Sequence, residues 1–132
     1  MIIYIIVFLI FSFLGWIIDT GYRSIIAGKF TSIGYFNAPL RPIYGFGGLF
    51  ISLIYKNLSS LNLFMQFFIA WIGLIIIELI GGWFCEMILK KKLWDYSDEF
   101  LNYKGWICLK HSIYWLILLI IYKIFLIIIN LK

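Results

Sequence analysis

Charged side chains are scarce in this chain. Asp, Glu, Lys and Arg make up 13% of its 132 residues, whereas they form about a quarter of a soluble domain. Hydrophobic residues account for 64%, aromatic residues for 21%, and the mean hydropathy is +1.04. A soluble protein is therefore excluded, and an integral membrane protein is indicated. At about 20 apolar residues per spanning helix, the length allows at most four or five spans and no separate soluble domain.

Cysteine and histidine are also few. Cys85 and Cys108 cannot form a disulfide framework and are interpreted as apolar residues. Cys108 and the single histidine, His111, lie three residues apart, but no CxxC pair or HExxH motif accompanies them. P-loop, GxSxG and dinucleotide-binding motifs are absent. We therefore expect no metal, no cofactor and no ATP hydrolysis by the chain itself, and enzymatic activity is disfavoured.

Four nearly uncharged segments remain, with approximate spans 2–18, 42–60, 62–89 and 112–131. They predict an all-α membrane protein: one transmembrane domain, 1–132, formed by a compact bundle of four transmembrane helices with two polar cytosolic loops. The second span is short and rich in Pro and Gly. Pro42 suits a first helical turn, and the glycines after it let helices approach closely. Short, interrupted spans of this kind also form the broken helices that hold substrates in transporters.

The basic residues are distributed unevenly over the connections. Loops 19–41 and 90–111 hold three and five Lys or Arg residues, whereas the opposite side holds only Lys56 and Lys132. Cytosolic loops carry the excess of Lys and Arg, so both loops are predicted to be cytosolic and both termini outside. This orientation explains the net charge of +5 better than binding of nucleic acid does.

Glu78 is the most deeply placed ionisable residue of the third span, about 16 Å from its cytosolic end at 1.5 Å per residue. An ionised carboxylate there costs a few kcal/mol, so it should be paired, protonated or facing water. Gly82 and Glu86 follow at i+4 and i+8 and share one helix face with it. This face indicates either a polar contact between helices or a pathway or binding site.

Asp19, Tyr22 and Arg23 are predicted to close the first helix, with Asp19 and Arg23 able to pair at i, i+4. A capped and anchored helix end and a functional site are both consistent with this pattern.

Asp95 follows Trp94 in the second polar loop and is expected either to cap a short turn or to pair with Arg23 or Arg41. Trp94 and Tyr96 suit the headgroup region of a membrane. Together with the other polar residues at this side, they give a candidate set for binding a substrate or a partner: Asp19, Tyr22, Arg23, Asn37, Arg41, Tyr44, Glu78, Glu86, Trp94, Asp95, Tyr96 and Asn102.

Several separated motifs occur in a characteristic order: Gly15-Trp16, Asn37, Pro39, Pro42-Ile43-Tyr44-Gly45, Trp94-Asp95-Tyr96-Ser97 and Asn102. From about Phe13 to Trp115 the chain resembles the CmpB-like family of small bacterial membrane proteins, the ABC-transporter type IV permeases. The family has Glu where this chain has Asp19, which keeps the charge. The resemblance implies a multi-pass protein of the bacterial plasma membrane that is assigned to transport.

Three functions follow as hypotheses. The first is a permease-like transport component, which would have to form an oligomer and recruit a separate ATPase because none is encoded here. The second is a membrane enzyme or lipid-headgroup-binding protein that uses the carboxylates as acid, base or cation ligands, and Arg23 and Arg41 to hold a phosphate. The third is an accessory or scaffold subunit of a membrane complex. In all three, the lipid bilayer is the first partner.

Overall fold

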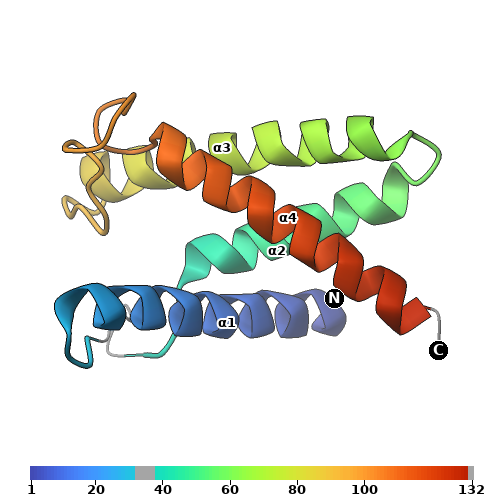
Figure 1. Ribbon diagram of the computed structural model, residues 1–132, viewed down its shortest axis with the longest axis horizontal. Coiled ribbons are helices and arrows are strands. Elements are labelled where there is room, and N and C mark those ends of the chain that lie inside the picture. The colour runs from blue at the N-terminus through green and yellow to red at the C-terminus, as the bar shows by residue number, and fades with distance from the viewer. Residues whose placement is uncertain (32–37, 131–132) are drawn as a thin grey trace. The chain divides into compact units, whose positions relative to one another are not determined.

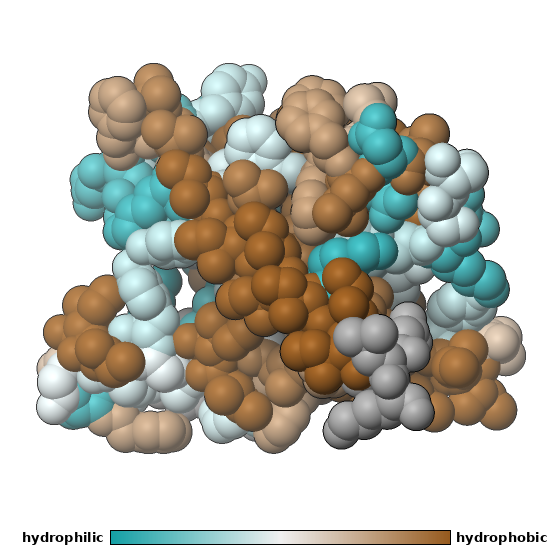
Figure 2. All heavy atoms as spheres, turned by 45° about the vertical axis from the view of Figure 1, so that its right-hand side comes forward, coloured by the Kyte–Doolittle hydropathy of each residue, from teal (hydrophilic) through white to brown (hydrophobic). Residues whose placement is uncertain are grey.

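The structure is a computed structural model that describes residues 1–31 and 38–130. These residues form four helices, α1 (Ile2–Ala27), α2 (Pro42–Asn57), α3 (Leu63–Met87) and α4 (Leu109–Asn130), and the described parts contain no strand (Figure 1). The predicted all-α class with four helices is therefore confirmed. Hydrophobic residues form large parts of the face shown in Figure 2, with hydrophilic residues beside them, which fits helices that contact lipid.

Three of the helices are long and apolar enough to cross a membrane: α1, α3 and the Leu109–Ile128 part of α4. α2 has 16 residues, which is about 24 Å at 1.5 Å per residue, against a hydrocarbon core of about 30 Å. The first helix is longer than predicted, because it continues to Ala27 and ends at Gly28 in a left-handed C-cap. Asp19, Tyr22 and Arg23 therefore lie within α1, and the prediction that they close it is wrong.

The chain divides into two compact units, Met1–Ser52 and Leu53–Lys132. In the first unit, α1 packs closely against the start of α2 through glycines. A Cβ atom at Gly15 would overlap the Tyr44 side chain, and one at Gly48 would overlap the Phe11 ring. A later residue of α2, Gly48, thus faces an earlier residue of α1, Phe11, than Tyr44 does. The two helices are therefore antiparallel.

α2 begins beside the middle of α1. The Arg41 backbone N–H, one residue before α2, donates to the Ser12 carbonyl over 2.9 Å. Ser12 lies about 22 Å from the Ala27 end of α1 at 1.5 Å per residue. Non-helical backbone at such a depth in a membrane occurs only where protein buries it or where it lines a water-filled cavity. α2 is thus a short helix that a non-helical segment precedes beside the middle of α1.

The contact between α1 and α2 depends on the absence of side chains at these glycines. Gly48→Ala is expected to destabilise the first unit by about 1–3 kcal/mol, because its methyl group would overlap the Phe11 ring. Gly21→Ala is the matched control on α1, since a Cβ there meets nothing within 4 Å and gains up to about 1 kcal/mol of helix propensity. Thermal unfolding of both variants in maltoside detergent measures the difference. Equal midpoints would contradict the packing argument.

In the second unit, α3 packs against α4. The Trp71 indole N–H donates to the Ser112 carbonyl over 2.7 Å, and Leu74 and Leu119 are fully buried. The connection between these helices, residues 88–108, folds beside the Met87 end of α3 and the start of α4 (Figure 1). It is called the α3–α4 loop below.

Candidate functional site

A buried ion pair connects the first unit's two helices. Nε of Arg41 lies 2.7 Å from Oδ2 of Asp19, and the Tyr44 hydroxyl donates to the other carboxylate oxygen, Oδ1, over 2.7 Å. The Arg41 side chain is 6% exposed and that of Asp19 19%. One carboxylate from α1 is thus held at the start of α2 by an ion pair with Arg41 and a hydrogen bond from Tyr44. This group is called the Asp19 cluster.

The local sequence explains this geometry. Pro42 is the first residue of α2, as predicted, and its missing N–H removes one of the donors that a helix start leaves unpaired. Arg41 immediately before it and Tyr44 in the first turn then lie at the positive end of the α2 dipole. Asp19 projects from α1 towards this end, so its negative charge is favourably placed there.

The other predicted residues of this region have different positions. Tyr22 and Arg23 are exposed on α1. The predicted pairing of Asp19 with Arg23 is wrong, because Asp19 binds Arg41, which is 22 residues further along the chain and is placed by the fold. Asn37 lies outside the described residues.

In the second unit, Glu78 is 4% exposed and accepts two hydrogen bonds. The Tyr96 hydroxyl donates to Oε1 over 2.9 Å, and the Trp115 indole N–H donates to Oε2 over 3.0 Å. Tyr96 comes from the α3–α4 loop and Trp115 from α4. Glu78 thus makes a polar contact with two other segments of the chain, and a pathway or binding role for it stays a prediction.

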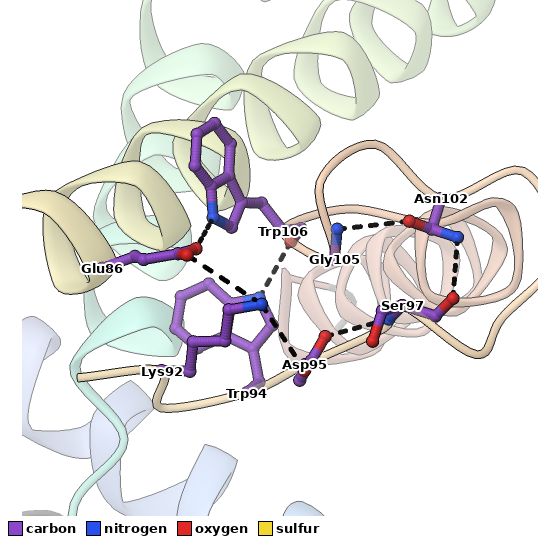
Figure 3. A network of polar contacts seen from close by, with 8 residues as sticks. All are labelled: Glu86, Lys92, Trp94, Asp95, Ser97, Asn102, Gly105 and Trp106. Atoms are coloured by element: carbon purple, nitrogen blue, oxygen red, sulfur yellow. Dashed lines mark hydrogen bonds and ion pairs between the residues drawn. The ribbon is translucent and has the colours of Figure 1, made fainter. Parts of the chain in front are cut away.

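The rest of the same α3 face is covered by the loop. Trp106 lies against Gly82, where a Cβ would come within 2.7 Å of the Trp106 Cβ, and its indole donates to Oε2 of Glu86 over 2.5 Å. The Lys92 ammonium lies 3.9 Å from the other oxygen of Glu86 (Figure 3). Glycine at the centre of this face thus makes room for an indole ring, and the two glutamates on either side anchor the loop.

A network of backbone and side-chain hydrogen bonds fixes the loop (Figure 3). Oδ1 of Asp95 accepts from the Ser97 backbone N–H over 3.0 Å, which is an Asx-turn. The Asn102 amide donates to the Ser97 carbonyl over 3.1 Å and accepts from the Gly105 N–H over 3.2 Å. Trp94 donates to the Trp106 carbonyl over 2.8 Å. Of the two roles expected for Asp95, the structure shows the turn cap.

Gly105 is required where this loop closes. Its φ is +72°, and a Cβ at this position would overlap Oδ1 of Asp95. Both the left-handed backbone and the close approach of the carboxylate favour glycine.

The pKa of Asp95 is lowered, first by hydrogen bonds from the Ser97 side chain and backbone and further by Lys92. A lowered folded-state pKa means that the stabilisation is complete above the ordinary value of 3.8 and is lost as the pH falls below it. We expect the protection of the Ser97 amide against hydrogen exchange, taken relative to the intrinsic exchange rate at each pH, to fall as the pH falls through this range. Asp95→Asn, which does not titrate, is the control and should show a smaller pH dependence. Identical profiles for the two proteins would contradict this role.

Cys108 and His111 face each other, as their spacing indicated, with Sγ 3.1 Å from Nδ1. Burial raises the pKa of the Cys108 thiol, so it remains protonated and unreactive at neutral pH. The imidazole stacks on Tyr96 with ring centroids 4.0 Å apart. Within residues 1–31 and 38–130, no group of three or more His, Cys, Asp or Glu residues is placed to hold a metal ion.

Sequence reasoning missed Trp106 and Trp115, the indole donors to Glu86 and Glu78, and it also missed Ser12. The sequence around Trp106 and Trp115 does not mark them as hydrogen-bond donors. In an apolar chain, the sequence does not distinguish a tryptophan that packs inside the protein from one that faces lipid. Ser12 was detectable in principle, since it lies seven residues before Asp19 on the same α1 face. Its hydroxyl is fully buried and has no hydrogen-bond partner among the described residues.

The fold and these clusters define a class: a helical membrane protein with three helices able to cross the bilayer, one short helix, and ionisable residues buried within each of its two units. Residues 6–131 match the family described as "Putative ABC-transporter type IV", the CmpB family. The chain belongs to this family, which covers nearly its whole length and confirms the resemblance found in the motifs. No curated protein and no solved structure gave a match.

Proposed function

We propose that the chain is a permease-like subunit of a membrane transport complex, in which the broken second crossing borders the solute path and a separate ATPase supplies the energy. Membership of the family supports the transport class. The observation that carries the proposal is the Asp19 cluster, an ion pair between α1 and the residue that precedes α2, which lies beside the middle of a helix able to span the membrane. Ionisable residues in spans are expensive, and broken helices place such residues at substrate sites.

The α3–α4 loop is the element that docks the ATPase in this proposal. Its basic residues, with those of residues 19–41, support a cytosolic position for both connections. Hydrogen bonds of Asp95, Asn102 and Trp94 hold the loop in one conformation, which suits transmission of a movement from a partner to α3 and α4. Because the chain carries no ATP-binding motif, the energy must enter through such a contact.

The lipid-headgroup enzyme is less well supported. It needs carboxylates that are open to a cation or a reacting group. The four carboxylates of the candidate set are instead engaged: Asp19 by Arg41, Glu78 by Tyr96 and Trp115, Glu86 by Trp106, and Asp95 by Ser97 and Lys92.

The transport proposal is tested on the chain isolated from its own host membrane in maltoside detergent. We expect an ATP-hydrolysing subunit to copurify. Proteoliposomes of this complex, loaded with cell extract, should change their solute content when ATP is added, as read by mass spectrometry. Arg41→Gln should abolish that change, and Lys29→Gln, which removes an exposed charge, should preserve it. A monomeric chain without ATPase activity or ATP-dependent flux would overturn the proposal.

A further inference from the structure

The start of α2 binds an anionic group of the protein itself, the carboxylate of Asp19. The carboxylate of Asp19 receives Nε of Arg41 on one oxygen and the Tyr44 hydroxyl on the other, both over 2.7 Å. A guanidinium, a hydroxyl and the positive end of a helix dipole together form the donor set that binds carboxylates and phosphates in proteins. We propose that this is a binding site for an anionic ligand group, carboxylate or phosphate, which Asp19 occupies when no ligand is bound.

The two halves of the ion pair differ in their burial. The Arg41 side chain is 6% exposed, whereas that of Asp19 is 19% exposed. Arg41 is also tied to α1 by its backbone, because its N–H donates to the Ser12 carbonyl. The cation is therefore fixed and enclosed, and the carboxylate is the partner that can be displaced by a rotation of its side chain.

A second observation points to a ligand at the same turn. The Ser12 hydroxyl is fully buried and has no hydrogen-bond partner among the described residues. It is directed at the first turn of α2, since a Cβ at Gly45 would overlap its oxygen. A buried hydroxyl without a partner is costly. It lies seven residues before Asp19, about 10 Å along α1 at 1.5 Å per residue, so a ligand that extends from Arg41 towards Ser12 would supply the missing hydrogen bond.

The charge around the cluster has the matching sign. Residues 1–52 contain Arg23, Lys29 and Arg41 but only one acidic residue, Asp19, which gives these side chains a net charge of +2. Such an excess raises the local concentration of anions. When the Asp19 side chain rotates away, Arg41 is available to an anionic ligand, and the Asp19 carboxylate competes with that ligand for it.

This inference rests on the proposed function, because it names the chemical class of the solute bound at the broken crossing. It is tested by equilibrium binding to the isolated chain, without ATPase and without flux. A failed binding test therefore leaves the transport proposal standing, and a failed transport test leaves the binding result standing.

The probe is inorganic phosphate, titrated into the chain in maltoside detergent by calorimetry, with chloride at equal ionic strength as the reference. Asp19→Asn removes the internal competitor, so it should bind phosphate about tenfold or more tightly than the unaltered chain. Phosphate should also raise the thermal midpoint of Asp19→Asn more than that of the unaltered chain. Arg41→Gln should bind no phosphate, and Lys29→Gln should bind it as the unaltered chain does.

A double variant and a lipid titration complete the test. If Arg41→Gln does not fold, the double variant D19N/R41Q takes its place and should give no phosphate response. Phosphatidylglycerol added to the micelles separates a lipid headgroup from a free anion, since stabilisation of Asp19→Asn by this lipid alone assigns the site to a headgroup. Phosphate affinity that is unchanged in Asp19→Asn, with no effect of the lipid, overturns the proposal. So does an equal loss of binding in Lys29→Gln and Arg41→Gln.

Discussion

Arg41→Gln is expected to lower the free energy of unfolding by about 3 kcal/mol, the lower end of the range for breaking a buried ion pair, because the Asp19 side chain keeps 19% of its exposure. The loss arises from a carboxylate left inside the protein without its cation. The double variant D19N/R41Q should recover most of it, since two neutral amides replace the pair together. Unfolding in mixed micelles of maltoside and dodecyl sulfate gives both values.

The double variant also separates stability from function. If the Asp19 cluster only holds α1 to α2, D19N/R41Q should be both stable and active in ATP-dependent flux. The transport proposal expects it to be stable and inactive. An additive loss of stability, with the double variant as weak as the sum of the singles, would contradict a direct pair between Asp19 and Arg41.

Glu78→Leu is expected to loosen the attachment of the α3–α4 loop to α3, because it removes one of the two glutamates that anchor it. The substitution removes the acceptor of both the Tyr96 hydroxyl and the Trp115 indole, and a buried donor that loses its acceptor costs about 1–3 kcal/mol. We therefore expect a destabilisation of about 2–6 kcal/mol for the two donors together. Hydrogen exchange should increase most in residues 93–106, because Tyr96 is the link between this segment and the middle of α3.

Glu99→Gln is the control for that experiment. Glu99 binds Lys110 over 3.0 Å, but both side chains are about one third exposed or more, at 35% and 40%. Exposed pairs contribute about 0–1 kcal/mol. Comparable losses in Glu78→Leu and Glu99→Gln would show that the position of Glu78 inside the protein is unimportant, and its two hydrogen bonds would then not anchor the loop.

The fold class was predictable because hydropathy requires no knowledge of tertiary contacts. Apolar runs and the Pro-Gly segment place the four helices, and Pro42 begins α2 as expected. The end of α1 was not predictable in this way. Asp19 and Arg23 have the charges of a helix boundary, yet the helix continues to Ala27, since Arg41 supplies the charge that lets Asp19 remain inside.

The candidate residues were recognised better than their pairings. Composition shows that Glu78 and Glu86 are unusual in a span, and spacing shows that they share a face with Gly82. Nothing in the chain indicates that Tyr96, Trp106 and Trp115 are the donors to these glutamates, because a hydrogen bond between distant segments depends on the folded path. Asp95 was the exception, since an Asx-turn is local and its partner is two residues away.

The distance along the chain between Asp19 and Arg41 bears on how the protein is made. Synthesis proceeds from the N-terminus, so α1 is complete before Arg41 leaves the ribosome. Until then, Asp19 meets the membrane without its cation, and an ionised carboxylate in a span is unfavourable by a few kcal/mol. Lasting insertion of α1 should therefore coincide with the arrival of α2. A nascent chain that stops at residue 36 should be held less firmly in the bilayer than one that extends through Asn57.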